Sequence, residues 1–196
     1  NADKAFEATG MKEMCLRNGV EWLNLRHLED KVELVVPGCE TLHDITVPRL
    51  VTESAIISAA KLKTHSSTTV TLGMKNLFGL LPTQFKAKYH AKGISNVIVD
   101  INTVIKPKLV VIDGFVGMEG NGPVDGTPVQ MGLIIAGTDV VATDATACRL
   151  MGIDHSKVKH LQKAAQKGLG SLDPQVIGEK LEAVAKQFKM AKAFGR

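Results

Sequence analysis

The spacing of apolar residues changes from segment to segment along the chain, and each spacing predicts a type of element. Apolar residues recur at positions 94, 97, 98, 101 and 105 and stop before Pro107, which predicts a helix. Largely apolar runs at residues 109–113 and 130–136 predict buried strands. Similar patterns predict helices at 4–18, 69–80, 139–151 and 156–167, strands at 20–25, 31–36, 45–51 and 54–63, and a short strand or a last helix within 174–190.

This alternation of strands and helices predicts an α/β fold with a mixed, largely parallel sheet and helices on both faces. The chain has 196 residues, of which 44% are hydrophobic and 22% charged, so we expect one globular domain over residues 1–196. The first residue is not Met and the chain opens directly on a helical pattern. We therefore expect that an N-terminal portion is missing.

Composition argues against several classes of protein. No apolar run reaches the roughly 18 residues of a transmembrane helix, and the first residues do not resemble a signal peptide, so we expect a cytoplasmic protein with no membrane partner. Cys15, Cys39 and Cys148 are widely spaced and indicate neither a disulfide framework nor an iron–sulfur or zinc motif. The net charge of +4 arises from a lysine-rich segment at 157–196 with few aromatic residues, so nucleic acid is not an expected partner.

Basic residues cluster where the predicted strand at 54–63 ends. In an extended chain, Lys61, Lys63 and His65 would project from the same face, about 6–7 Å apart. Ligands of open α/β sheets bind beyond the carboxyl ends of buried strands, which is where these residues lie. The cluster therefore predicts an anion-binding site, and the alternative is an edge strand whose solvated lysines prevent aggregation.

Lys75 adds a cation on the predicted helix 69–80. It shares a helix face with Thr71 and Gly79, which leave room for a ligand, and Asn76 beside it can orient a carboxylate, a phosphate or a metal-bound water. An ordinary exposed lysine on an amphipathic helix is the alternative.

Asp144 falls on the apolar stripe of the predicted helix 139–151. A buried carboxylate needs a partner, because burial without one costs several kcal/mol. We expect the lysine cluster to be that partner. Lys75, His65 and Asp144 are accordingly the predicted catalytic groups, with Lys75 providing electrostatic stabilisation or proton transfer. Asp139 is expected to cap its helix.

A glycine-rich segment at residues 114–123 is predicted to be a long loop between two strands. Asp113 at its start and Glu119 within it are candidate ligands for a divalent cation, among backbone amides that could also bind an anion. The segment lacks the Gly-Lys-Ser/Thr of a phosphate-binding loop. A flexible hairpin connection explains it equally well.

The other histidines carry less information. His27, His43, His155 and His160 have no metal-ligand spacing and are expected on the surface. His65 and His90 are the candidates for proton transfer.

Four segments in order, KLKTH, TLGMKNLFGLLP, KLVVIDGFVGMEGNGP and AGTDVVATDATACRLMGI, resemble the family called domain of unknown function 362. The resemblance covers nearly the whole chain and implies that one cleft gathers the motif residues. These residues are Lys61, Lys63, His65, Lys75, Asn76, Asp113, Glu119, Gly120, Gly122, Asp139 and Asp144. Relatives usually carry a further N-terminal strand and helix, and some carry a ferredoxin-like segment with iron–sulfur cluster motifs, which this chain lacks.

These patterns together predict an enzyme or enzyme-like domain, with no reaction yet assignable, that binds a small anionic substrate, a carboxylate or a phosphate. Its predicted substrate-binding residues are Lys61, Lys63, Asn76, Gly120 and Gly122, and its predicted metal ligands are Asp113 and Glu119. The alternative is a non-catalytic partner of a ferredoxin-like redox protein, in which the lysines dock an acidic surface. A third interpretation is that the lysine–aspartate network only stabilises the fold.

Overall fold

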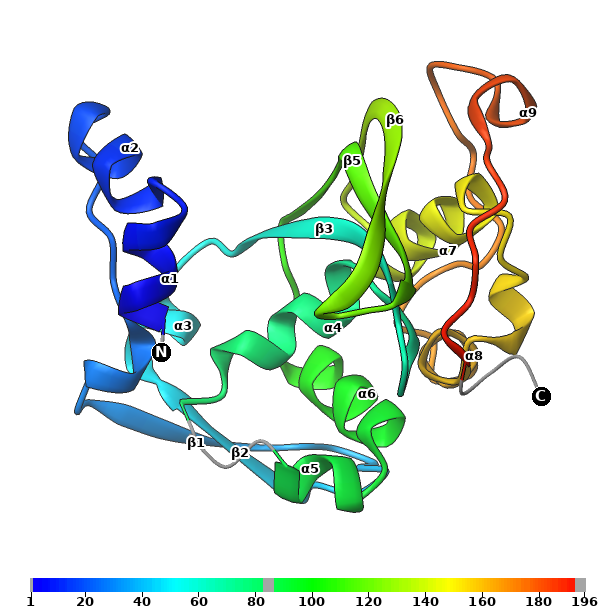
Figure 1. Ribbon diagram of the computed structural model, residues 1–196. Coiled ribbons are helices and arrows are strands. Elements are labelled where there is room, and N and C mark those ends of the chain that lie inside the picture. The colour runs from blue at the N-terminus through cyan, green and yellow to red at the C-terminus, as the bar shows by residue number, and fades with distance from the viewer. Residues whose placement is uncertain (1, 83–86, 193–196) are drawn as a thin grey trace.

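The computed structural model describes residues 2–82 and 87–192, which form two sheets and a series of short helices (Figure 1). The strands are β1 (Lys31–Val35), β2 (Asp44–Pro48), β3 (Ile57–His65), β4 (Thr69–Thr71), β5 (Leu109–Asn121) and β6 (Asp125–Gly137). The α-helices are α1 (Ala2–Ala8), α2 (Met11–Arg17), α3 (Arg49–Glu53), α4 (Gly73–Asn76), α5 (Ala87–Ala91), α6 (Ile94–Val104), α7 (Val140–Leu150), α8 (Lys159–Gln166) and α9 (Leu181–Val184). Short 3-10 helices are η1 (Leu25–His27), η2 (Leu77–Leu80) and η3 (His155–Lys157).

The larger sheet has the strand order β4–β3–β5–β6 within the described residues. Strands β3 and β5 are parallel, whereas β3–β4 and β5–β6 are antiparallel hairpins, and β1 and β2 form a separate antiparallel pair. The predicted α/β class with a mixed sheet is confirmed. The sheet has less parallel pairing than predicted because two of its connections are hairpins, which join antiparallel strands.

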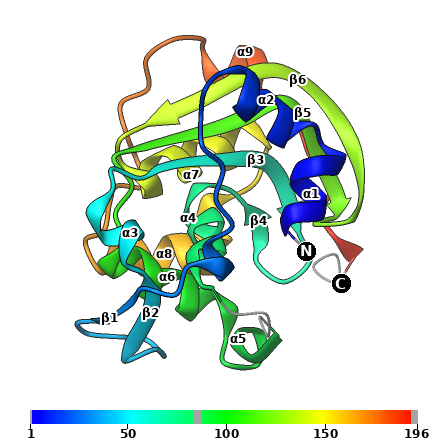
Figure 2. The same ribbon diagram turned by 90° about the vertical axis from the view of Figure 1, so that its left-hand side faces the viewer.

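Helices α4 and α7 pack against one face of the larger sheet, with α6 and α8 beyond them (Figure 2). Along β3, the side chains that point to these helices are buried, and those that alternate with them are more exposed until the strand approaches His65. On the other face of the sheet, Ile57, Phe115 and Ile134 are exposed. The main core therefore lies between the sheet and its helices.

Residues 4–25 form different elements from those predicted. The predicted helix 4–18 is divided into α1 and α2 at Gly10, whose φ of +69° is a left-handed value that glycine adopts without strain. The prediction of a strand at 20–25 is wrong. The chain there leads into η1, which begins after Asn24, whose side chain accepts a hydrogen bond from Arg26 N.

The predicted helix 69–80 begins later than expected. Residues 69–71 extend as β4 and pair with the end of β3, a conformation that suits their β-branched side chains. Helix α4 begins at Gly73 because Asp144 of α7 accepts hydrogen bonds from Gly73 N and Met74 N, at 2.7 and 2.9 Å. It continues into η2, so Lys75 and Asn76 still lie on a helix.

The prediction of a glycine-rich loop at 114–123 is wrong, because β5 extends through this segment to Asn121. Its glycines allow close packing within the sheet rather than a free backbone. A Cβ on Gly117 would lie 3.1 Å from both Leu62 O and the Phe188 ring. Near Gly114, the strand bulges and its register shifts against β6.

The remaining predicted elements are confirmed as β1, β2, β3, α6, β5, β6, α7 and α8, with ends that differ by a few residues. Strand β2 ends at Pro48, earlier than predicted, because residues 49–53 form α3. The segment 174–190 contains the helix α9 rather than a strand. The predicted domain also includes residues 1, 83–86 and 193–196, which lie outside the described residues.

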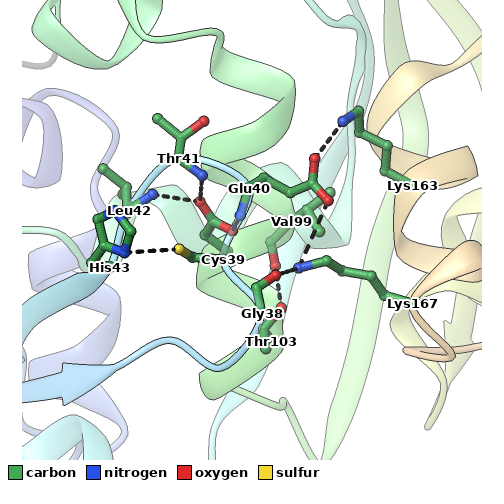
Figure 3. A network of polar contacts seen from close by, with 11 residues as sticks. Gly38, Cys39, Glu40, Thr41, Leu42, His43, Val99, Thr103, Lys163 and Lys167 are labelled. Carbon is green, nitrogen blue, oxygen red and sulfur yellow. Dashed lines mark hydrogen bonds and ion pairs between the residues drawn. The ribbon is translucent and has the colours of Figure 1, made fainter.

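A polar network holds the tip of the β1–β2 hairpin against α6 and α8 (Figure 3). The buried carboxylate of Asp100 on α6 accepts hydrogen bonds from the backbone N–H groups of residues 40–42, at 2.6–2.8 Å. Glu40 also forms ion pairs with Lys163 of α8 and with Lys167 directly after that helix, and the hydrogen bond from Lys163 lowers the pKa of the Glu40 carboxyl. A single buried carboxylate therefore organises this turn.

Candidate functional site

The β3–β4 hairpin brings two of the predicted basic residues to one surface. Antiparallel pairing sets Lys63 opposite Thr71 and His65 opposite Thr69, so these side chains share one face of the hairpin. Lys63 is half-buried, and burial lowers the pKa of its ammonium group. His65 is only 6% exposed. Both groups are thus partly removed from water at the end of β3.

The ring of His65 lies among positive charges. Its burial, together with the nearby side chains of Lys75, His90 and Lys63, lowers the pKa of His65 to about 4. The ring is therefore neutral at pH 7. Its Nδ1 accepts a hydrogen bond from Ser67 N at 3.0 Å, so in the neutral ring Nε2 carries the proton and can donate it.

Lys75 reaches this region from α4, where its Nζ lies 5.6 Å from the centre of the Phe78 ring. The position of α4 depends on Asp144, which is fully buried and binds the N–H groups of Gly73 and Met74. Burial raises the pKa of Asp144 to about 7. The predicted lysine partner of Asp144 is therefore wrong: backbone amides at the start of α4 satisfy this carboxyl group, as they satisfy a capping residue.

Asn76 fixes the same helix to the sheet. Its side-chain amide donates hydrogen bonds to Ser58 Oγ and Ala59 O at the start of β3, both at 3.1 Å. Ser58 in turn donates to Gly73 O. These contacts place Asn76 in a supporting position for α4, at the opposite end of β3 from His65.

His160 is a residue of this region that the sequence did not indicate. The prediction that it lies on the surface is wrong, because its ring is fully buried on the face of α8 that also carries Leu161 and Ala164. That apolar spacing was the available signal. Burial, with Lys75 and His65 nearby, lowers the pKa of His160 to about 3.

Buried polar atoms without partners accompany these basic groups. Neither ring nitrogen of His160 has a hydrogen-bond partner among the described residues, and the same holds for Thr71 Oγ1, which lies opposite Lys63. Buried polar groups are normally hydrogen-bonded. Each such group in a folded protein needs an explanation, such as a bound water or ion.

Lys61 and Asp113 form an ion pair next to this region. They lie side by side on β3 and β5, with an N–O distance of 2.7 Å. The hydrogen bonds from Lys61 and from Phe115 N lower the pKa of Asp113. Both side chains are about half exposed, so this pair is open to solvent.

Glu119 and Gly120 lie at the distal end of β5, beside the end of β3, and Gly122 lies in the turn directly after β5. Glu119 accepts a hydrogen bond from Lys189 N at 2.8 Å. Gly120 O accepts one from Thr64 Oγ1, also at 2.8 Å, and a Cβ on Gly122 would lie 2.1 Å from Thr64 O. These residues hold β5 against β3 and the C-terminal segment, close to the strand end that carries His65.

The two predicted metal ligands do not converge. Asp113 and Glu119 are six residues apart on one strand, roughly 15–20 Å along it at about 3.3 Å per residue, and each has its own lysine partner. Across residues 2–82 and 87–192, no group of three or more His, Cys, Asp or Glu side chains is arranged to hold a metal ion. A divalent cation remains a prediction.

Comparison with known proteins gives one named relative. The chain is 36% identical over 121 residues to "Thylakoid-associated protein sll1697" of Synechocystis sp. (strain ATCC 27184 / PCC 6803 / Kazusa). The match covers 59% of this chain and 37% of that protein, so the chain matches little more than a third of the relative's length. No solved structure matches. Within the described residues, the helices are too short or too polar to span a membrane.

The family comparison includes the basic region. Residues 1–149 match the family described as "Domain of unknown function (DUF362)", a range that contains every predicted site residue. His160 lies beyond it. Since the match extends over most of the sequence, the chain belongs to the DUF362 family, a domain family of unknown function.

Proposed function

We propose that this domain binds a small anion, a carboxylate or a phosphate, at a basic site formed by Lys63, His65 and Lys75. The observation that carries the proposal is the gathering of these groups around the buried ring of His65, whose pKa is lowered by burial and by both lysines. Lys63 is half-buried beside His65, and an anion bound there would offset the cost of burying its charge. The unsatisfied Thr71 Oγ1 beside Lys63 adds a neutral hydrogen-bonding group.

Each residue would have a distinct role in this site. Lys63 and Lys75 supply positive charge, and the neutral ring of His65 donates a hydrogen bond from Nε2. In a reaction of the bound anion, Lys75 would stabilise developing negative charge. Asp144 is a positioning residue, because it acts through the backbone amides that begin α4.

Isothermal titration calorimetry with inorganic phosphate and with malonate, with and without Mg²⁺, tests the proposal. Binding to the wild type should be lost in Lys75→Met and Lys63→Met and retained in Lys106→Met, which removes an exposed lysine elsewhere. Thermal unfolding provides a second measurement, because a ligand at about 100 times its Kd adds roughly 2.7 kcal/mol of stability. Equal binding by Lys75→Met and the wild type would refute the assignment.

The alternative function, docking of a ferredoxin-like protein, can be separated by salt. A protein-docking surface uses exposed charges, and its affinity falls steeply with ionic strength. Lys63 and His65 are instead half-buried and buried, which favours a small ligand. Binding of an acidic ferredoxin that is lost at 0.5 M NaCl, with no calorimetric signal from either anion, would favour docking.

A further inference from the structure

A second region, distinct from the basic site, has the form of a ligand pocket. A cavity of about 540 Å³ opens beside the turn that joins β3 to β4. Its polar lining includes Ser67, Thr68, Thr69, Ser95, Lys157 and Lys159. The volume falls within the range of roughly 300–1,000 Å³ that is typical of small-molecule sites. Its size therefore suits a ligand larger than a simple ion.

Four segments distant in sequence converge on this cavity. Residues 67–69 are three consecutive hydroxyl-bearing residues, of which Thr68 already donates to Val70 O at 2.9 Å, and Ser95 adds a fourth from the first turn of α6. Lys157 and Lys159 come from η3 and the first residue of α8, and the C-terminal segment contributes Gln187. The cavity is thus built by the fold rather than by one surface loop.

The lining combines positive charge, hydroxyl groups and an amide with the apolar side chains of Ile153 and Met190. Lys157 and Lys159 outnumber the one carboxylate of the lining, Asp154, which already accepts a hydrogen bond from Ser156 N at 3.0 Å and lies 3.5 Å from Lys157 Nζ. Neither α6 nor α8 has a side chain that caps its first turn, so N–H groups near Ser95 and Lys159 add positive potential. Hydroxyl groups and a carboxamide are suited to hydrogen bonds with a polyol.

We infer that this cavity binds a phosphorylated polyol of the sugar-phosphate class. The phosphate lies between Lys157 and Lys159, and the sugar hydroxyls contact residues 67–69, Ser95 and Gln187. The inference goes beyond the proposed function, because the cavity shares no residue with the basic site.

Thr69 supports a functional role for this turn. Its φ of +70° is left-handed, which is unfavourable for a β-branched residue, so the surrounding structure must impose it. Thr69 also pairs with His65 across the hairpin, and Ser67 N donates to His65 Nδ1. The cavity and the basic site therefore lie on two parts of one hairpin.

Calorimetric titration with glucose 6-phosphate, glucose and inorganic phosphate tests the inference. The wild type should bind glucose 6-phosphate more tightly than either of the other probes. The double variant Lys157→Gln/Lys159→Gln should bind it about tenfold more weakly or worse, because each lysine contributes a charge-assisted hydrogen bond. Ser95→Ala should also weaken binding, and Lys180→Gln, an exposed lysine outside the cavity, should leave it within about twofold.

The outcomes separate the two sites. Binding of glucose 6-phosphate that persists in Lys75→Met but fails in the double variant supports the cavity, whatever the fate of the basic site. Absence of binding by the folded wild type overturns the inference, as does equal binding by the wild type and the double variant. Circular dichroism shows whether each variant is folded.

Discussion

Replacing Asp144 by Asn tests how the first turn of α4, and with it Lys75, is held in place. The Asp144 carboxyl group is fully buried and accepts two hydrogen bonds, from Gly73 N at 2.7 Å and Met74 N at 2.9 Å. An Asn side chain has the same shape, but only its carbonyl oxygen can accept. One buried N–H is left unsatisfied in the variant, which costs roughly 1–3 kcal/mol.

The pH dependence of this cost follows from the pKa of Asp144. Burial raises that pKa from 3.8 to about 7. The unfolded chain loses the proton near pH 4, whereas the folded protein keeps it to about pH 7, so stability falls as pH rises through this window. Each pH unit within the window changes the free energy of unfolding by about 1.4 kcal/mol, which gives a loss of about 2.5 kcal/mol between pH 5 and pH 8.

The two buried histidines change stability with pH in the opposite direction to Asp144. The pKa values of His65 and His160 are lowered to about 4 and about 3, so below pH 6.5 the unfolded chain takes up protons that the folded protein does not. Each histidine therefore lowers stability by about 2 kcal/mol at pH 5 relative to pH 8. Because Asp144→Asn retains both histidines, the difference between wild type and variant isolates the carboxyl group.

Urea unfolding of both proteins at pH 5 and pH 8 provides the measurement. The variant should be less stable than the wild type at pH 5, and between pH 5 and pH 8 the difference should move by about 2.5 kcal/mol in the variant's favour, so that the two proteins become similar or the variant becomes the more stable. A difference of equal size at both pH values would refute the reasoning. It would show that Asp144 is already ionised at pH 5 and that its two amide bonds outweigh burial.

Two further changes test the supports of the fold. Asp100→Ala removes the acceptor of three backbone N–H groups and should lower the free energy of unfolding by about 3 kcal/mol or more in urea; a loss below about 1 kcal/mol would contradict the role of this residue. Gly122→Ala places a Cβ 2.1 Å from Thr64 O and should lower the thermal midpoint strongly. Gly79→Ala, where a Cβ meets no atom within 4 Å, is the matched control and should change the midpoint little.

The sequence predicted elements well where one apolar pattern dominates a segment. Helix α6 and the two strands of the long hairpin have such patterns, and their positions are confirmed. Prediction failed where distant contacts decide the conformation. The glycines in 114–122 indicated a loop. In the sheet, however, several of them lie so close to neighbouring segments that a side chain would not fit. Residues 69–71 follow a helical pattern, yet pairing with β3 makes them a strand.

In the candidate site, too, the sequence grouped residues that are near one another in the chain and missed those that distant packing brings in. Proximity in sequence was enough to group Lys63, His65 and Lys75, because a hairpin and a short turn separate them. The buried residues around them could not be grouped in this way. Asp144 is 71 positions away from the amide of Gly73 that it binds, and His160 reaches the region only through the packing of α8 against α6. Nothing local in the sequence specifies either contact.

Strand register determines which of the two lysines of β3, Lys61 or Lys63, is paired with a carboxylate. On β3, Lys61 lies directly beside Asp113 of β5 and is neutralised by it. Two residues further on, the bulge of β5 sets Lys63 beside Met118, and on its other side Lys63 faces Thr71 of β4. A strand without the bulge would bring a residue near 115 beside Lys63 instead. The same sequence motif therefore yields an exposed ion pair at one position and, through register alone, a half-buried cation beside an unsatisfied hydroxyl group at the next.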